Sequence, residues 1–191
     1  MNRVIQRRTL LRWLGCFASI LITHVITACD QAPIPTASVE LDSRNNDEQP
    51  ALSGNGRFLA FVSNREGTRS IFIYDLKERR YVYLPRLNRR DAIAESPSLS
   101  YTGRYIAYIA SDSARPEIEL YDRATQRAQI LTMGYRGWFR NPKISPDGRY
   151  IVFETGARGQ WDIEVLDRGA NVELDIPDFQ RSRPIPNASP P

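Results

Sequence analysis

Histidine and cysteine are nearly absent from this sequence. Its 191 residues include one histidine, His24, and two cysteines, Cys16 and Cys29. We expect His24 and Cys16 to be removed with an N-terminal export segment, and Cys29 to carry lipid. A mature chain without histidine or a free thiol excludes a Ser-His-Asp triad, a Cys-His pair, a His-containing zinc site and the usual haem ligands. A disulfide within the chain is excluded for the same reason.

Other motifs of catalysis and ligand binding are missing as well. The sequence has no Gly-x-Ser-x-Gly elbow, no phosphate-cradling glycine loop and no EF-hand calcium loop. It therefore predicts no cofactor and no metal site. Two pairs of carboxylates remain, Glu117 with Glu119 and Asp162 with Glu164, each on one face of a predicted strand. Such pairs could hydrolyse glycosides, but the alternation favours solvent-facing carboxylates between core residues. Those core residues would be Ile118, Leu120, Ile163 and Val165.

Net charge depends almost entirely on the N-terminal segment. The whole chain has 26 basic and 22 acidic residues, and residues 1–28 hold four arginines and no acidic residue. Without that segment the chain is formally neutral. Nucleic-acid binding needs a basic domain, so it loses its main support in the sequence.

Residues 1–28 have the pattern of a cleaved signal peptide. The arginines precede an apolar run over residues 13–28, which is shorter than the roughly 20 residues of a membrane-spanning helix. Adjacent Arg7 and Arg8 resemble a twin-arginine export signal, although an ordinary basic leader explains them equally well.

The end of this segment, Ile-Thr-Ala-Cys at residues 26–29, resembles a bacterial lipobox. The resemblance implies that Cys29 receives a diacylglyceryl group and becomes the first mature residue; an ordinary signal with an incidental cysteine is the alternative. Residues 29–37 contain Pro33 and Pro35 and would form an extended tether. Two acyl chains anchor a protein stably. We therefore expect a lipid-anchored protein of the bacterial cell envelope that faces the periplasm or the exterior.

A pattern of short strands recurs three times with a period of 45 to 47 residues. The copies begin at Pro50, Pro97 and Pro142, share a Ser-x-x-Gly-Arg-aromatic core, and each ends 25 residues later at an aspartate. Alternating β-branched and aromatic residues between glycine-containing turns predict strands. Repeats of this length built from short strands are typical of β-propeller blades.

The third copy, Ser-Pro-Asp-Gly-Arg-Tyr-Ile-Val-Phe at residues 145–153, resembles the repeat of TolB-type β-propellers, which belong to the Tol-Pal system of the periplasm. Only this copy has the complete Ser-Pro-Asp-Gly turn. Over residues 38–176 the resemblance implies an all-β fold of three four-stranded antiparallel blades, an incomplete ring. TolB itself has a six-bladed ring and an additional N-terminal domain, so a Tol-Pal role rests on analogy alone.

The repeat sets the expected limits of the blades. They would span about residues 49–84, 96–131 and 141–176, with outer strands at 81–84, 129–131 and 172–176. Residues 38–41 resemble one more outer strand. The proline-rich tail, residues 177–191, should be disordered.

The loop before the third blade is the best candidate for partner binding. It combines aromatic and arginine side chains, which are enriched at binding hot spots, in a variable loop on a rigid scaffold. Alternatively, Trp138 or Phe139 fills the space between two blades. The candidate residues are Tyr135, Arg136, Trp138, Phe139 and Arg140.

Turns at the other end of the blades are rich in arginine. This charge would steer an acidic partner or an anionic lipid surface. The alternative is that arginine only keeps the turns soluble.

From these features we expect an envelope lipoprotein whose propeller segment is a protein-interaction module and not an enzyme. Its partner would be an envelope protein or a cell-wall polymer. One alternative is binding of polysaccharide or peptidoglycan through Trp138 and Trp161, and a remoter one is a hydrolase that uses Glu117 and Glu119.

Three blades leave two apolar end faces. A second copy, most simply in a six-bladed dimer, would cover them; another protein could do so instead, or the chain is a degenerate fragment of a longer ancestor.

Overall fold

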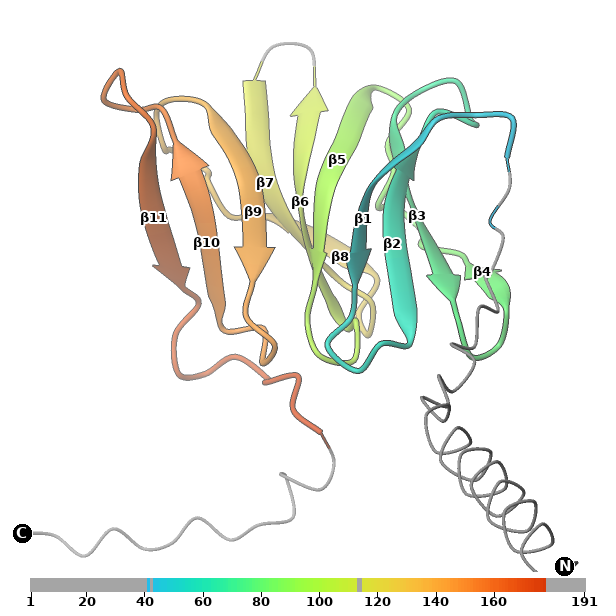
Figure 1. Cartoon of the computed structure of the whole chain (residues 1–191). Coiled ribbons are helices and arrows are strands. Elements are labelled where there is room, and N and C mark those ends of the chain that lie inside the picture. The colour runs from blue at the N-terminus through green and yellow to red at the C-terminus, as the bar shows by residue number, and fades with distance from the viewer. Residues whose placement is uncertain (1–40, 42, 113–114, 178–191) are drawn as a thin grey trace, which may run out of the picture. The chain divides into compact units, whose positions relative to one another are not determined.

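The computed structural model describes residues 41, 43–112 and 115–177, and within these ranges its regular structure is entirely β (Figure 1). No helix in this part of the chain is long and apolar enough to cross a membrane. The predicted signal peptide, the tether, most of the predicted strand at 38–41 and nearly all of the tail lie outside the described residues.

Three antiparallel sheets follow one another along the chain, and we call them blades one, two and three. Blade one has the order β1 (Asp47–Leu52), β2 (Phe58–Ser63), β3 (Ser70–Asp75) and β4 (Arg80–Val82). Blade two has β5 (Ala92–Leu99), β6 (Tyr105–Asp112), β7 (Arg115–Asp122) and β8 (Arg127–Ile130). Blade three has β9 (Phe139–Ile144), β10 (Tyr150–Thr155) and β11 (Asp162–Asp167). The predicted all-β fold of three antiparallel blades is confirmed.

The outer strand predicted at residues 172–176 is the exception, because this segment does not join blade three. It runs instead to the turn of blade two, where the buried carboxylate of Asp175 accepts hydrogen bonds from Ser100 Oγ (2.6 Å) and the backbone N–H of Thr102 (2.7 Å). The Asp175 N–H donates to the carbonyl of Asp147 (2.8 Å). Blade three therefore has three strands within the described residues, and this segment ties it to blade two.

The residues shared by all three copies are those that the first hairpin turn requires. In each turn the serine hydroxyl accepts a hydrogen bond of 2.9 Å from the N–H five residues later. The glycine three residues after that serine has a φ between 70° and 79°, a conformation that favours glycine. The two residues between them differ in each copy, and in copies one and three the second of them, Asn55 or Asp147, also accepts hydrogen bonds from the serine hydroxyl and from the N–H two residues later. The serine and glycine pairs are Ser53 with Gly56, Ser100 with Gly103, and Ser145 with Gly148.

A second repeated contact joins the start of the second strand of each blade to the end of its third strand. The arginine after each turn glycine pairs with the aspartate that ends the third strand, at 2.7 Å for Arg57–Asp75, 3.2 Å for Arg104–Asp122 and 2.8 Å for Arg149–Asp167. The Arg57 guanidinium lowers the pKa of Asp75 to about 2, and two backbone N–H groups of the next turn also bond this carboxylate.

Two further turn arginines lie against the preceding blade. The Arg123 guanidinium lies 4.1 Å from the ring of Phe58, and that of Arg168 lies 4.4 Å from the ring of Tyr105. Each also donates to the carbonyl of a turn glycine. These arginines therefore hold turns and blades together at this end.

Apolar side chains between neighbouring blades form the core. One cluster fills the space between blades one and two, and it includes Phe58, Ile71, Ile73, Ile106, Tyr108 and Tyr121. A second fills the space between blades two and three, and it includes Tyr105, Ile109, Ile118, Phe139, Ile151 and Phe153. Each blade is thus stabilised mainly by the blade beside it.

Candidate functional site

The loop between blades two and three contains both exposed and buried members of the predicted binding surface. Trp138 is 61% exposed and Tyr135 41%, and Met133 beside them is 75% exposed. Phe139 is buried, with its ring edge-on to the rings of Phe153 (5.8 Å) and Tyr135 (6.2 Å). Phe139 therefore fills the space between blades, as the alternative interpretation held, while Trp138 faces solvent.

Arg140 is also held by its own blade. Its guanidinium lies 3.8 Å from the centre of the Trp161 ring and pairs with the carboxylate of Glu154. Arg136 is exposed. Arg140 is exposed as well, but its guanidinium is already engaged by Trp161 and Glu154. We therefore call Tyr135, Arg136 and Trp138, with Met133, the loop surface.

The backbone of this loop is fixed by contacts with blade three and β7. Gly137 has a φ of 116°, and a Cβ atom there would lie 2.7 Å from the Cα of Ala157, so no other residue fits without displacement. The Trp138 carbonyl accepts a hydrogen bond from the N–H of Gly156 (2.9 Å). Arg115 donates to the Tyr135 carbonyl. The exposed side chains are therefore presented on a constrained backbone, which lowers the entropy lost on binding.

The first carboxylate pair lies in a setting that the sequence did not predict. Glu119 is 2% exposed and accepts hydrogen bonds from the hydroxyl of Tyr108 (2.5 Å) and from Arg89 (2.9 Å). Glu117 accepts one from Thr132. The expectation that Glu119 faces solvent was wrong, because the segment between β4 and β5 brings Arg89 over this side of blade two. Burial, and then the bond to Glu119, raises the pKa of Tyr108.

The second carboxylate pair shows the opposite error. Ile163 and Val165, predicted to be core, are 68% and 63% exposed, whereas Asp162 and Glu164 between them are half-buried. The side chains of Ile163 and Val165 face away from blade two, and no sheet in the described part of the chain covers that side of blade three. The alternation was correctly predicted, but the face that it would bury has no neighbour.

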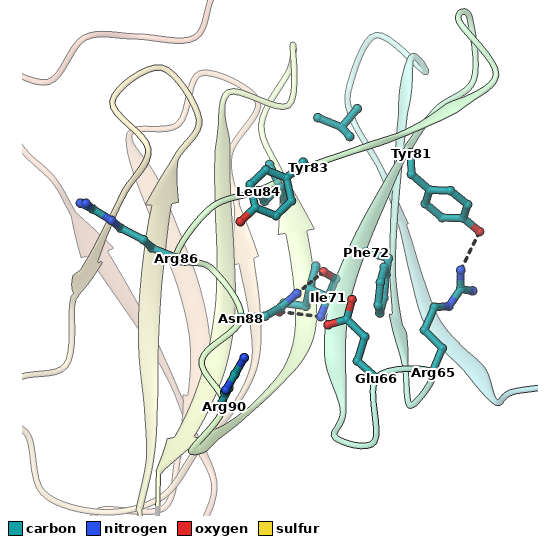
Figure 2. Close-up of a pocket in the computed structure, with 11 residues that line it drawn as sticks. Arg65, Glu66, Ile71, Phe72, Tyr81, Tyr83, Leu84, Arg86, Asn88 and Arg90 are labelled. Atoms are coloured by element: carbon teal, nitrogen blue, oxygen red, sulfur yellow. Dashed lines mark hydrogen bonds between the residues drawn. The ribbon is translucent and has the colours of Figure 1, made fainter.

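A groove at the outer edge of blade one was not predicted at all (Figure 2). It forms because β4 pairs only with residues 73–75 of β3, so the first half of β3 has β2 on one side and no strand on its outer side. There the side-chain amide of Asn88 bonds both the N–H of Ile71 (2.9 Å) and its carbonyl (2.8 Å). This amide caps the edge and so blocks addition of a peptide strand at Ile71.

The groove has a volume of about 580 Å³ and a basic, aromatic lining. Its cations do not converge, however. Arg65 donates to the hydroxyl of Tyr81 (2.8 Å) and pairs with Asp47, whereas Arg86 extends away from them (Figure 2). The short outer strand and the many arginines between residues 81 and 90 are the only signals from which it could have been predicted.

Across the described residues, no group of three or more His, Cys, Asp or Glu side chains could hold a metal ion.

A scan of protein-family models found no match for the chain, and a search of curated proteins found no similar sequence. Solved structures do match. TolB from Acinetobacter baumannii is 25% identical with a TM-score of 0.59, over 68% of this chain and 31% of that one. A putative TolB from Agrobacterium tumefaciens is 21% identical with a TM-score of 0.55, over 67% and 44%.

Enzymes share this fold as well. A puromycin-hydrolyzing peptidase from Mycobacterium tuberculosis is 15% identical with a TM-score of 0.50, over 64% of this chain and 19% of the peptidase. The chain spans less than half the length of each of these three proteins. The likeness to the two TolB structures agrees with the resemblance predicted from the Ser-Pro-Asp-Gly repeat, and the chain has a TolB-like β-propeller fold.

Proposed function

We propose that this chain is a lipid-anchored protein of the bacterial envelope whose propeller segment binds another protein without catalysing a reaction. The observation that supports it most is the loop surface, where Met133, Tyr135 and Trp138 are exposed beside Arg136 on a constrained backbone. Tryptophan, tyrosine and arginine are the side chains that most often carry binding energy at protein interfaces.

The carboxylates support binding over catalysis. Glu119 is held by Arg89 and Tyr108, and Asp175 by a serine and a threonine, so both carboxylates stabilise the fold. A glycosidase needs two carboxylates on either side of a substrate. Glu119 does not meet this requirement, because it is 2% exposed.

Crosslinking in the envelope tests the loop surface. A photoreactive amino acid at position 133 of the full chain should capture a specific protein in cells of the native bacterium. Trp138→Ala should weaken this capture strongly, since loss of a hot-spot residue costs at least about 2 kcal/mol, or roughly 30-fold in affinity. Tyr83→Ala is the matched control, because Tyr83 is 86% exposed but lies on blade one. Equal capture by Trp138→Ala and the unchanged chain would contradict the proposal.

Fractionation tests the anchor. Cys29→Ser removes the atom to which lipid would attach, so the chain should move from the membrane fraction to the aqueous fraction of lysed cells. The expected loss is large, because a diacyl anchor holds a protein stably on a membrane and the variant has no such anchor. Cys16→Ser is the control and should leave the chain in the membrane fraction. A Cys29→Ser chain that stays with the membrane would show that something other than lipid retains it.

Binding of a cell-wall polysaccharide is a second candidate. Trp138 and Trp161 each have an atom within 4 Å of the position that a Cβ on Gly156 would take, and they are 61% and 48% exposed. Sugar rings bind by stacking on the face of an indole ring, but Arg140 already covers one face of Trp161. Trp161→Ala separates the two candidates, because it should abolish a polysaccharide pull-down and leave the protein crosslink at position 133 unchanged.

A further inference from the structure

Two faces of the propeller segment have no neighbouring blade in the described part of the chain. On blade three, Tyr150, Ile163 and Val165 are 38%, 68% and 63% exposed, and we call this side the blade-three end face. On blade one, Leu52 is 58% exposed, and Leu59 and Tyr74 are half-exposed beside it. We call this side the blade-one end face. Figure 1 shows blades one and three at opposite ends of the row of sheets.

The blade-three end face has the residues that each earlier blade uses to contact the next one. At these repeat positions blade one presents Phe58, Ala60, Val62, Ile71 and Ile73 to blade two. Blade two presents Tyr105, Ala107, Ile109, Ile118 and Leu120 to blade three. Blade three has Tyr150, Val152, Glu154, Ile163 and Val165. Four of these five are again apolar, although no blade covers them.

The blade-one end face has the residues that receive such a contact. Blade two receives blade one with Leu99, Ile106, Tyr108 and Tyr121. Blade three receives blade two with Ile144, Ile151, Phe153 and Leu166. The same repeat positions in blade one are Leu52, Leu59, Phe61 and Tyr74. Phe61 is already buried, with Arg65 over its ring, whereas Leu52, Leu59 and Tyr74 remain partly or mostly exposed. Apart from Phe61, the two end faces are therefore the uncovered halves of a contact that this chain already makes twice.

One detail of the internal contacts shows this directly. The ring of Phe58 lies against the turn glycine of blade two, where a Cβ on Gly103 would be 3.1 Å from it, and the ring of Tyr105 lies still closer to Gly148 of blade three. Phe58 and Tyr105 are 7% and 3% exposed. The equivalent ring on blade three is Tyr150, at 38% exposed. The equivalent glycine on blade one, Gly56, has no atom within 4 Å of such a Cβ.

We propose that the blade-three end face of one copy packs on the blade-one end face of a second copy. A two-fold axis then repeats the contact on the other side, so two chains close one ring of six blades. This number lies within the roughly four to eight blades of closed propellers. Because the contact joins two different faces, two copies close the ring only when one is rotated by 180° relative to the other.

Charge on the inner strands favours the same pairing. Within the chain, β1 contacts β5 and β5 contacts β9, so β9 of one copy would lie beside β1 of the other. Strand β9 carries Arg140 and Lys143, and β1 carries Asp47 and Glu48. All four are exposed, but Arg140, Asp47 and Glu48 already form ion pairs with Glu154, Arg65 and Arg69 within the chain. The charge complementarity of the proposed contact therefore rests on Lys143, which would lie beside the acidic strand β1.

Cysteine crosslinking locates the contact on the full chain. The Ile144 N–H donates to Ser98 Oγ (3.1 Å) across the contact between blades two and three. The equivalent positions across the proposed contact are Leu52 and Lys143. Co-expression of differently tagged Leu52→Cys and Lys143→Cys chains should give one oxidised product that carries both tags and has the mass of two chains. Each single variant expressed alone is the control for the native cysteines, and light scattering in detergent should also report two chains.

Disruption of one face provides the second measurement. Ile163→Lys with Val165→Lys should abolish the crosslinked product and leave the circular dichroism unchanged, because both side chains are mostly exposed. Met133→Lys changes a 75% exposed position outside both end faces, so this variant should still form the crosslinked product. A monomer without crosslinks would overturn the proposal, as would a ladder of larger species. Crosslinks formed by Lys143→Cys alone would overturn it too, because they would place two blade-three end faces together.

Discussion

Ile118→Ala should lower the free energy of unfolding by about 2–5 kcal/mol, the usual cost of truncating a fully buried isoleucine. Ile118 is completely buried between blades two and three, so its truncation leaves a cavity that the surrounding side chains fill only in part. Ile71 holds the same repeat position in blade one at 1% exposed, so Ile71→Ala should cost a similar amount. Urea unfolding followed by circular dichroism measures both.

Blade three supplies the control at the same repeat position. Ile163 is 68% exposed, so Ile163→Ala in the isolated monomer should change stability by no more than about 0.5 kcal/mol. In a ring of two copies this residue would be covered, and its cost would then rise with protein concentration. An Ile163→Ala monomer as unstable as Ile118→Ala would contradict the conclusion that blade three has an uncovered face.

The blades could be predicted from the sequence because their determinants are local. The turn serine bonds an N–H five residues away, and each arginine pairs with an aspartate 18 residues away, within one repeat. Such contacts recur whenever the repeat recurs. By contrast, the partners of Asp175 on Ser100 and Thr102 are 75 and 73 residues away, which no repeat pattern encodes. The fourth strand of blade three was therefore predicted wrongly.

Burial depends on neighbours in the same way. Period-2 alternation correctly assigned Ile163 and Val165 to one face and Asp162 and Glu164 to the other, but it could not show which face another sheet covers. The candidate site follows the same rule. Trp138 and Phe139 are adjacent in sequence, yet the strand that begins at Phe139 turns one ring into the core and leaves the other in solvent.

The largest electrostatic effect should come from Arg89. Its guanidinium donates to Glu119 at 2.9 Å, and the Glu119 side chain is 3% exposed against 37% for Arg89. The Glu119 carboxylate accepts side-chain hydrogen bonds from Arg89 and Tyr108. In Arg89→Met the buried carboxylate keeps the bond from Tyr108 but loses the charge that balances it. Loss of one partner of a buried pair costs about 3–5 kcal/mol, and the exposed arginine should reduce this to roughly 2–3 kcal/mol. Chemical unfolding of the variant at neutral pH measures the loss.

The double variant Arg89→Met with Glu119→Gln shows whether the loss comes from the stranded charge. A glutamine can still accept the hydrogen bond from Tyr108 but has no charge to neutralise, so the double variant should be more stable than Arg89→Met alone. Glu119→Gln by itself should cost less than Arg89→Met, because Arg89 can turn to solvent and to Asp112, which lies 3.5 Å away. If the two single losses simply add, Arg89 and Glu119 are not coupled. Glu119 would then be held by packing and by its hydrogen bond from Tyr108, and the segment between β4 and β5 would not be fixed to blade two by this ion pair.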